Sequence, residues 1–345
     1  MADVSTIGLD IAKAVFHAHG ADASGQMVFS RRLTRAKLLE FFAAQPRCVV
    51  ALEACGGAHH WARELTSLGH DVRLIPPAYV KPFVKRSKSD AIDAEAICEA
   101  AQRPSMRYVA IKSEDQQAAG MVFRTRDLLV RQRTQLINAI RGHLTEFGWV
   151  APKGPSHVAV LASLLEDGEE VGASLPEAAR MMFQVMTGQL ATLNEQVALL
   201  DKEIARRARE DEAARRLMTI PGVGPITATA LLALGPPAES FAKGRDFAAW
   251  LGLTPRQRST GGKEKLGSIS KMGERTLRRL LIIGSSAVVL QASRRGAPRG
   301  SWLEQMMARK PRMLVTVALA NKTARIIWAV MMKGENYKAP VAVAA

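Results

Sequence analysis

Two apolar segments near the start of the chain each end in a single acidic residue. Asp10 closes the run Ile7-Gly8-Leu9, and Glu53 closes the longer run Cys48–Leu52. An unbroken apolar run such as Cys48–Leu52 is typical of a strand in a sheet that is covered on both faces. The pattern therefore favours a layered α/β domain with acidic groups where its strands end.

Two further carboxylates lie in a helical stretch, Lys88–Ile97. Asp90 and Asp93 are three residues apart, so they share one face of the helix and can point at one spot. Carboxylate oxygens suit Mg²⁺ or Mn²⁺, hard cations that keep water ligands for phosphate substrates. If these two residues converge with Asp10 and Glu53, the four predict a metal-dependent phosphoryl-transfer site that acts on nucleic acid.

Residues 1–107 form the first predicted domain, in which strands and helices alternate. The predicted strands are Val4–Leu9, Val15–Ala18, Gln26–Ser30, Cys48–Glu53 and Asp71–Ile75, with a helix at His59–Leu68 between the last two. Three strands in a meander, followed by β-α-β alternation, fit an RNase H-like mixed sheet.

Residues 108–215 are predicted to be a long helical coiled-coil linker. Glu114–Phe147 lacks proline, a looser segment (151–175) follows, and Pro176 starts a second long helix. That second helix has an a/d heptad seam made of Met186, Leu190, Leu193, Val197, Leu200 and Ile204. The spacing leaves two alternatives open, because such helices can pair within one chain or join two chains.

The net charge of +16 is concentrated in residues 216–345. This segment holds 21 Lys and Arg against 6 Asp and Glu, a balance of +15, so the first 215 residues carry only +1. A basic third beside a neutral remainder is expected of a module that binds a polyanion. A basic surface kept for solubility is the plainer alternative.

The basic third, residues 216–345, begins with a helix-hairpin-helix pattern at Ile220–Ala228. Gly222 and Gly224 permit a turn with positive φ and a close backbone approach. The N–H groups at the start of the following helix can hold a phosphate. A plain glycine turn between packed helices would look similar, but the neighbouring basic excess favours nucleic acid.

A loop rich in glycine, hydroxyl and basic residues follows at Gly252–Lys263. Its Ser259 and Thr260 are candidate nucleophiles, although chemistry alone favours a phosphate-contact loop, because no base is fixed beside them in the sequence. Arginine side chains fork onto phosphates, and glycines let the backbone approach them. The residues predicted to contact nucleic acid are Gly222, Gly224, Arg256, Arg258, Lys263, Lys271, Arg275, Arg278 and Arg279.

Taken in order, these motifs resemble the DEDD transposases of bacterial insertion sequences, the IS110 family and its IS1111 branch. The matching segments are Ile7–Lys13, Leu52–Gly56, Lys88–Ala94, Ile220–Gly224, Ser259–Lys263 and Ile269–Gly273. The resemblance covers nearly the whole chain. It implies an N-terminal Holliday-junction-resolvase-like domain with an RNase H fold, a helical coiled-coil linker, and a C-terminal transposase domain (216–345).

The resemblance also implies a mechanism. Asp10, Glu53, Asp90 and Asp93 map onto the family's acidic tetrad, which would hold Mg²⁺ or Mn²⁺, and a C-terminal serine would attack DNA and form a covalent intermediate. A gap-free match from Pro255-Arg256 puts Thr260 in the serine position, with Ser259 immediately before it. The primary hydroxyl of Ser259 is less hindered, so Ser259 is the predicted nucleophile and Thr260 the alternative.

The expected partners are donor DNA, target DNA and a structured guide (bridge or seeker) RNA. The protein is expected to act as a dimer or tetramer. It is expected in the bacterial cytoplasm, associated with the nucleoid. No apolar run reaches the ~18 residues of a membrane span, and no signal peptide is evident. Three cysteines in this setting indicate reduced thiols, and neither the cysteines nor the histidines have zinc-ligand spacing.

Three alternatives to this function remain at the level of sequence. The first is an RNase H-type nuclease or junction resolvase that uses water as its nucleophile. The second is a sugar kinase or actin-like ATPase, which needs further phosphate-binding glycine loops that residues 1–150 lack. The third is a non-enzymatic nucleic-acid-binding protein. Near the acids, Glu95 is predicted to be solvated surface, while Glu99, Lys13 and Lys88 stay open as metal or phosphate contacts.

Overall fold

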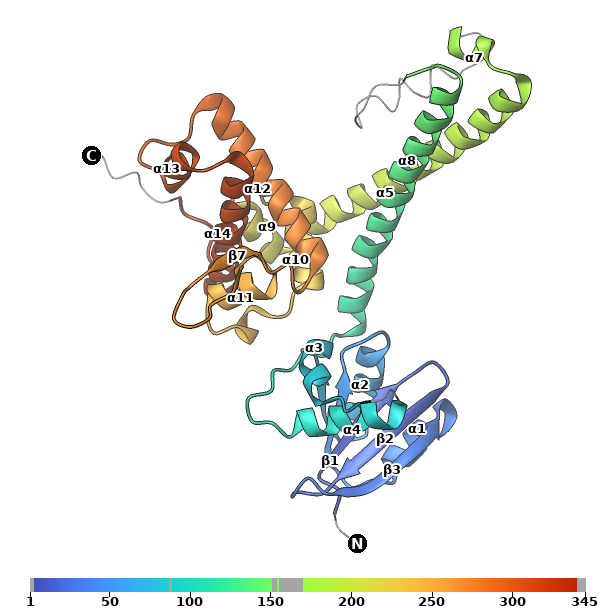
Figure 1. Cartoon of the computed structure of the whole chain (residues 1–345), viewed down its shortest axis with the longest axis vertical. Helices are drawn as coiled ribbons and strands as arrows, with labels where there is room; N and C mark the ends of the chain where they lie inside the picture. The colour runs from blue at the N-terminus through green and yellow to red at the C-terminus, as the bar shows by residue number, and fades with distance from the viewer. Residues whose placement is uncertain (1–2, 87–88, 151–153, 155–169, 340–345) are drawn as a thin grey trace. The chain divides into compact units, whose positions relative to one another are not determined.

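The computed structural model describes residues 3–86, 89–150, 154 and 170–339 (Figure 1). It divides into two compact units, an N-terminal unit (Met1–Gln117) and a C-terminal unit (Ala118–Ala345). Lys88 and most of the predicted looser segment 151–175 lie outside the described residues. The finer division of the chain at residues 107 and 215 stays a prediction.

The N-terminal unit is built on a five-stranded mixed sheet in the order β3-β2-β1-β4-β5. Its strands are β1 (Thr6–Ile11), β2 (Val15–Ala21), β3 (Met27–Thr34), β4 (Val49–Glu53) and β5 (Asp71–Ile75). β1 pairs antiparallel with β2 and parallel with β4, and β5 continues the parallel side. The predicted RNase H-like sheet is confirmed, and its three meander strands extend further along the chain than the sequence indicated.

Helices cover both faces of this sheet, as the unbroken apolar run Cys48–Leu52 predicts. One face, carrying Ile7, Leu9 and Leu52, packs on α1 (Leu38–Ala43) and α2 (Ala58–Ser67). The other face carries Ala51 and Ile75 and packs on α4 (Asp90–Ala101), with α3 (Pro77–Val80) and η2 (Lys81–Phe83) beside it. Figure 1 shows α4 lying across the sheet on this second face, called the α4 face below.

Two long helices pair within the chain. They are α5 (Glu114–Glu146) and α8 (Glu177–Glu210), joined through a region that includes α7 (Glu170–Ser174). Arg126 of α5 forms an ion pair with Asp201 of α8, and Arg133 donates to Asn194. Four of the six predicted seam residues are buried: Leu190, Leu193, Val197 and Ile204. Most of the seam of α8 is therefore buried inside the chain, as pairing within one chain predicts, and pairing between chains stays a prediction.

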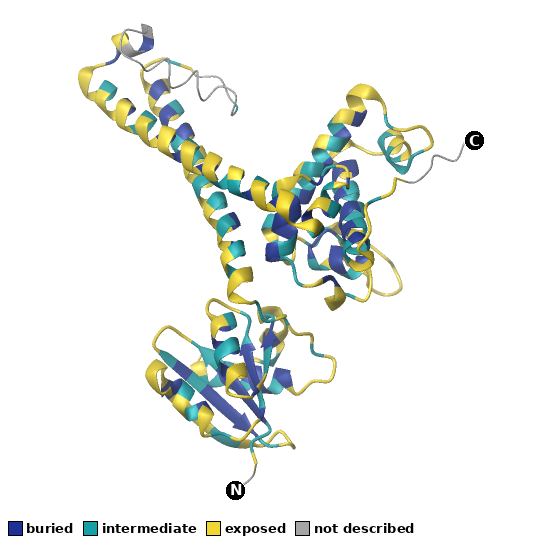
Figure 2. Ribbon diagram, turned by 180° about the vertical axis from the view of Figure 1, so that it is seen from behind, coloured by how far each residue is buried: buried dark blue, intermediate teal, exposed yellow. Residues whose placement is uncertain are grey.

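The rest of the C-terminal unit is mostly helical around one core. Its elements are α9 (Glu212–Met218), α10 (Pro225–Leu234), η4 (Ala238–Ser240), α11 (Gly244–Trp250), β6 (Pro255–Gln257), β7 (Leu266–Ile269), α12 (Arg275–Arg295), α13 (Trp302–Arg309) and α14 (Arg312–Lys333). Phe123 of α5 and Ile204 of α8 enter this core, so the helix pair is anchored in it. Figure 2 shows the buried residues gathered where these helices meet.

One helix, α14, is long and apolar enough by length and composition to cross a membrane. Its Ala320, Ala324 and Ile327 are fully buried, and they belong to the core of the C-terminal unit. Asn321 of the same helix donates to the carbonyl of Leu253. A core helix of a globular unit meets the same length and composition criteria, and these contacts describe α14 as such a helix.

Candidate active site

The parallel pairing of β1 and β4 brings two of the predicted acids together. Leu9 lies opposite Leu52, so the next residues, Asp10 and Glu53, are neighbours where the two strands end. Leu9 and Leu52 point into the core beneath α1 and α2. Because successive side chains alternate between faces, Asp10 and Glu53 lie on the α4 face.

A glycine lets α4 approach this end of the sheet. A Cβ on Gly8 would lie 2.2 Å from the carbonyl oxygen of Ala94 and 2.4 Å from the amide nitrogen of Cys98, so the helix backbone rests directly on β1. Ser89 caps the helix by accepting a hydrogen bond from the Ile92 amide. Asp90 and Asp93 stand in the first turn after this cap. The contact at Ala94 therefore carries that turn to the side of Asp10.

The other three carboxylates are close enough to Asp10 to act on its charge. Burial and then the charges of Asp93, Asp90 and Glu53 together raise the pKa of Asp10 from 3.8 to about 6. The pKa of Glu53 is also raised, by burial and then by Asp93. In the part of the chain that the structure describes, no ion pair involves any of the four. The site is a concentration of uncompensated negative charge.

The donor set fits a hard divalent cation. Among the described residues, no three His, Cys, Asp or Glu side chains are placed to enclose one ion by themselves. This is compatible with Mg²⁺, which is usually held by one or two carboxylates and completes its octahedron with waters and substrate phosphates. Asp10 is the central candidate ligand, because its pKa responds to all three of the other acids.

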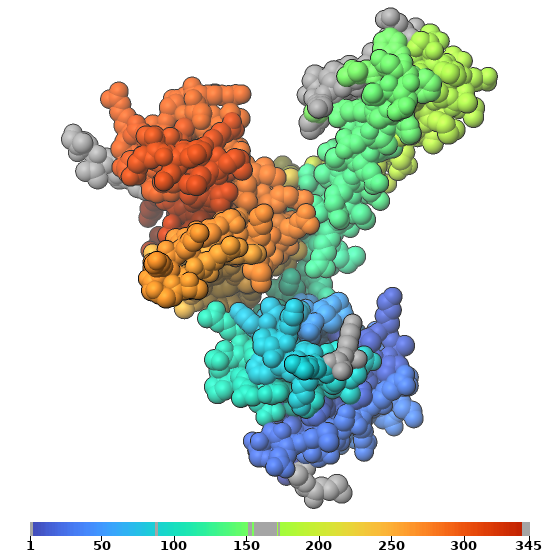
Figure 3. Space-filling model, viewed as in Figure 1, coloured from blue at the N-terminus to red at the C-terminus, as the bar shows by residue number. Residues whose placement is uncertain are grey.

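The candidate nucleophiles stand on a hairpin in the C-terminal unit. β6 and β7 pair antiparallel, and between them Thr260 and Lys263 form a further bridge, with the Lys263 amide donating to Thr260. Gly261 and Gly262 have φ of +55° and +76°, which a tight turn requires here and which side chains resist. Ser259 and Thr260 are exposed. Figure 3 shows this segment, in orange, at the surface of its unit.

Comparison with known proteins identifies a family that matches both the segment with the four carboxylates and the segment with the Ser259 hairpin. A model of the IS116/IS110/IS902 transposase family matches residues 214–299, and a second transposase model, for the DEDD domain of IS110 elements, matches residues 7–148. A probable family 20 transposase of Pseudomonas aeruginosa is 48% identical over 336 residues, which is 97% of this chain and 99% of that protein. The chain belongs to the IS110 family of transposases.

Named insertion elements also match this transposase along its length. The transposase for element IS1328 of Yersinia enterocolitica is 40% identical over 97% of the chain and 98% of its own length. The transposase for IS1111A of Coxiella burnetii is 38% identical over 98% of the chain and 92% of its own length. The predicted family is confirmed, and with it a transposase that moves insertion sequences by phosphoryl transfer on DNA. The DEDD domain implies use of a divalent metal.

Three of the arginines predicted to bind phosphate also hold the transposase fold together. Arg256 donates to the carbonyl of Ser270, and Arg278 donates to the carbonyls of Leu251 and Met272. Arg279 pairs with Asp127 of α5. The remaining predicted cations are exposed and have no ion pair within the described residues: Arg258, Lys263, Lys271 and Arg275. These four are the better candidates for phosphate contacts.

The two glycines of the predicted hairpin motif differ in their surroundings. Gly222 has φ of +83°, and a Cβ there would lie 2.8 Å from the carbonyl oxygen of Gly284 in α12. Gly224 precedes α10, and a Cβ there would meet nothing within 4 Å. Gly222 is therefore needed for packing against α12, and only the Gly224 side of the turn is open to a phosphate.

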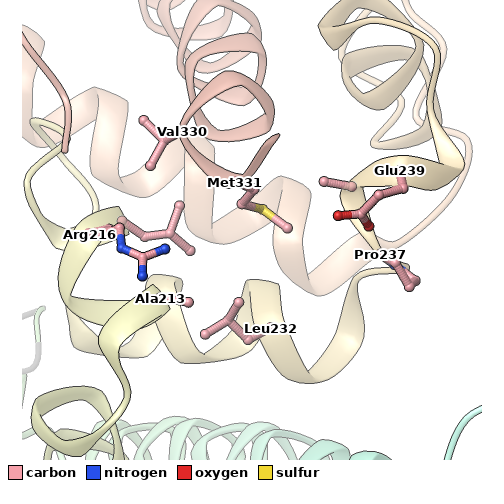
Figure 4. A pocket seen from close by; sticks show the side chains of 9 residues that line it. Ala213, Arg216, Leu232, Pro237, Glu239, Val330 and Met331 are labelled. Atoms are coloured by element: carbon pink, nitrogen blue, oxygen red, sulfur yellow. The ribbon is translucent and has the colours of Figure 1, made fainter. Parts of the chain in front are cut away.

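A small cavity of about 190 Å³ lies in the C-terminal unit (Figure 4). Its walls are largely apolar, including Leu232 and Met331, and Arg216 and Glu239 also line it. None of the predicted site residues lines this cavity. It is not a candidate for the chemistry of the transposase.

Two residues beside the acids were missed by sequence reasoning. His17 of β2 lies opposite Asp10, and only the sheet register reveals it. Cys55 is close to Glu53 and Asp10, whose charges, after burial, raise the pKa of its thiol. Its position two residues after Glu53 was the available signal. Glu95, predicted to be solvated surface, is half-buried and forms an ion pair with Lys85, and Glu99 pairs with Arg103.

Proposed function

We propose that this transposase is an RNA-guided recombinase that cuts and rejoins DNA strands at a composite site. One half of the site is the tetrad Asp10, Glu53, Asp90 and Asp93, and the other is the hydroxyl of Ser259, with Thr260 as the alternative. The observation that carries the proposal is geometric: Asp10 and Glu53 end neighbouring parallel strands, and Gly8 lets the first turn of α4, with Asp90 and Asp93, rest beside them. Grouped carboxylates of this kind favour a divalent cation, and such a cation can bind a DNA phosphate.

The residues divide the work by their chemistry. Mg²⁺ or Mn²⁺ held by the tetrad supplies Lewis-acid stabilisation of charge on the phosphate. The Ser259 oxygen attacks phosphorus, a serine–phosphate bond forms, and the bond from phosphorus to the DNA 3′ oxygen breaks. The leaving oxygen takes up a proton. A cation held there would also favour ionisation of the Ser259 hydroxyl, whose proton would pass to solvent, so the hydroxyl would need no base beside it in the sequence.

The halves of the proposed site belong to different compact units. The tetrad lies in the N-terminal unit and the hydroxyl hairpin in the C-terminal unit. We therefore propose that a bound DNA and RNA complex assembles them, from one chain or from two chains of a dimer or tetramer. Cleavage would then wait until donor and target are both in place.

The basic third is the proposed surface for donor DNA, target DNA and a structured guide RNA. It carries a balance of +15, and the open side of the helix-hairpin-helix at Gly224 and the exposed cations of the hairpin belong to it. Phosphate contacts of this kind give affinity without sequence preference. We propose that sequence choice is delegated to the RNA and that the protein works in the bacterial cytoplasm on nucleoid DNA.

The nucleophile is tested by trapping the covalent intermediate. A suicide DNA that loses the short fragment with the free 3′ hydroxyl after cutting should leave a 5′-phosphoserine on the wild-type protein, located by mass spectrometry of the peptide. Ser259→Ala should abolish the adduct, and Thr260→Ala should retain it within a few-fold. The reverse result would make Thr260 the nucleophile. Cutting and rejoining by both variants would defeat the covalent mechanism.

A metal-dependent nuclease or junction resolvase with water as nucleophile is the second candidate. The tetrad on an RNase H-like sheet favours it as much as the first, because these acids alone do not specify the attacking group. It predicts a free 5′-phosphate product that carries one ¹⁸O atom when the reaction runs in H₂¹⁸O, with no adduct in any variant. The recombinase predicts no label in the rejoined strand.

RNA guidance is tested separately, by sequencing the RNA that co-purifies with the protein from its own host. One discrete, structured RNA from the DNA that flanks its gene is the expected result. A matched preparation of the Arg258→Ala, Lys263→Ala double variant should yield less of it. Random cellular RNA in the wild-type preparation would contradict guidance and leave the transposase assignment intact.

A further inference from the structure

One row of side chains crosses the sheet at the level of Asp10. The register places Arg32 of β3 opposite His17 of β2, and His17 opposite Asp10 of β1. Glu53 of β4 is the next member beyond Asp10. Neighbours in such a row point to the same face of the sheet. A basic and a hydrogen-bonding side chain therefore continue the acidic site toward the edge strand.

The packing of the neighbouring residues fixes the face on which this row lies. Phe16, Ala18 and Leu33, which alternate with His17 and Arg32, are buried in the core beneath α1 and α2. His17 and Arg32 must then point to the opposite face, where the carboxylates are. Arg32 is exposed and His17 is half-buried, so both can be reached from solvent.

His17 is held in place from the edge strand. Its Nε2 lies 3.0 Å from the hydroxyl oxygen of Ser30. With Nε2 engaged by Ser30, Nδ1 of His17 can form a further hydrogen bond. In the part of the chain that the structure describes, Arg32 has no ion pair or hydrogen-bond partner, so its five donors are available.

His17 and Arg32 can offset the repulsion between the four carboxylates and the DNA phosphates. Four carboxylates without cationic partners attract metal ions, but they repel the phosphates that flank the reacting one. Strands lie about 4.8 Å apart, which puts the Cα of Arg32 roughly 10 Å from that of Asp10. Successive phosphates of one strand wind around the helix axis, so they lie farther apart than the rise of about 3.4 Å per nucleotide, and this distance spans about one or two nucleotides.

We propose that His17 and Arg32 bind the phosphates of the cleaved strand next to the scissile one, and so set the position at which the carboxylate site cuts. The proposal rests on the carboxylate site of the proposed function. It assigns binding to His17 and Arg32, and no proton transfer. DNA would then cross the sheet from the acidic row toward β3.

Adjacent residues provide a matched control. Arg31 carries the same charge on the same strand, but it points to the other face, where its guanidinium lies over the rings of Phe29 and Phe41. Arg31→Ala and Arg32→Ala thus remove the same charge one residue apart. Only Arg32→Ala removes it from the face of the acids.

The test combines these variants with donor DNA in which one phosphate at a time is a neutral methylphosphonate. The full-length protein is assayed with its co-purifying RNA and Mg²⁺, in single-turnover cleavage. Arg32→Ala should raise the DNA concentration for half-maximal cleavage about ten-fold, the usual scale for a charged hydrogen bond. At one flanking position, a methylphosphonate should raise this DNA concentration about ten-fold for the wild type and leave it almost unchanged for Arg32→Ala. His17→Ala should do the same nearer the scissile bond, with His17→Gln partly active.

Three outcomes would overturn the proposal. Equal effects of Arg31→Ala and Arg32→Ala would assign only general charge to this strand. Methylphosphonate penalties that are additive with Arg32→Ala at every position would exclude a contact. Normal cleavage by Asp10→Asn would remove the acidic site itself, whereas an inactive Asp10→Asn beside an unaffected Arg32→Ala would leave the proposed function standing and this inference alone refuted. Circular dichroism melts of each variant identify any that fail to fold.

Discussion

The four carboxylates and the hydroxyl hairpin differ in how firmly the fold holds them. Asp10 and Glu53 end neighbouring strands of a five-stranded sheet, and α4 rests on β1 through the backbone at Gly8. Ser259 and Thr260 stand on an exposed two-stranded hairpin whose turn consists of two glycines. Charges that repel must be held together by a rigid frame. The proposed nucleophile would have to meet DNA bound at another unit of the protein, so it would gain from standing on an exposed segment.

The largest expected effect comes from the rigid half. Asp10→Asn should lower strand cutting in Mg²⁺ by about a thousand-fold or more, because it removes the central carboxylate and the charge that a metal-bound phosphate requires. Cys55→Ser, at the rim of the same site, is the control and should keep activity within a few-fold. Gel assays of donor-strand cutting measure both. An active Asp10→Asn would break the comparison by making the carboxylates structural.

The frame itself is tested at Gly8. Gly8→Ala would force a Cβ to within 2.2 Å of the Ala94 carbonyl oxygen and push α4 off the sheet. Overpacking of this kind should lower the free energy of unfolding by about 3 kcal/mol, with a loss of cutting at temperatures where the protein stays folded. Gly56→Ala, where a Cβ meets nothing within 4 Å, is the matched control and should be neutral. Urea denaturation curves that coincide for the two variants would contradict the packing argument.

Two glycine variants in the C-terminal unit distinguish a role in packing from a role in DNA binding. Gly222→Ala should destabilise that unit by about 2 kcal/mol, because φ is +83° and the Gly284 carbonyl is close. Gly224→Ala should leave thermal stability unchanged and weaken binding of duplex DNA by a few-fold. Differential scanning calorimetry and fluorescence anisotropy measure the two quantities. Loss of DNA binding without loss of stability in Gly222→Ala would reverse the roles assigned here.

The smallest effect is the pH dependence of the acidic site. The folded pKa of Asp10, about 6, lies above its ordinary value of 3.8, so protonation favours the folded protein. That contribution is complete below pH 3.8 and is lost as pH rises through 6. Without metal at pH 7.5, Asp10→Asn should therefore be more stable than wild type by about 1 kcal/mol, the full shift being discounted for solvent screening.

The same pair of proteins tests the metal. The stability difference should shrink toward pH 4, and added Mg²⁺ should raise the melting temperature of the wild type but not of Asp10→Asn. Melting curves in EDTA and in Mg²⁺ across this range measure it. A wild type that is the more stable protein in EDTA at pH 7.5 would mean that the carboxylates do not oppose one another in the fold.

Many of the candidate site residues could be predicted because short sequence patterns indicate them. Apolar runs that end in Asp10 and Glu53, and two acids three apart on a helix, name the tetrad without any knowledge of the fold. The hydroxyl loop could be found in the same way from its glycines and basic residues. His17 could not, because its place beside Asp10 depends on how two strands align. Likewise, Arg256, Arg278 and Arg279 have partners in the fold that no local pattern indicates.

The amino-acid sequence by itself determined the family and the basic third and named the four candidate carboxylates, because periodicity, motif spacing and charge are properties of neighbours along the chain. Only the tertiary structure showed that α8 contacts α5 of the same chain, that Gly222 packs against α12, and that Arg32 and His17 lie in one row with Asp10 and Glu53. Those facts depend on register and on close approach between distant segments, which are settled by the free energy of the whole packed unit.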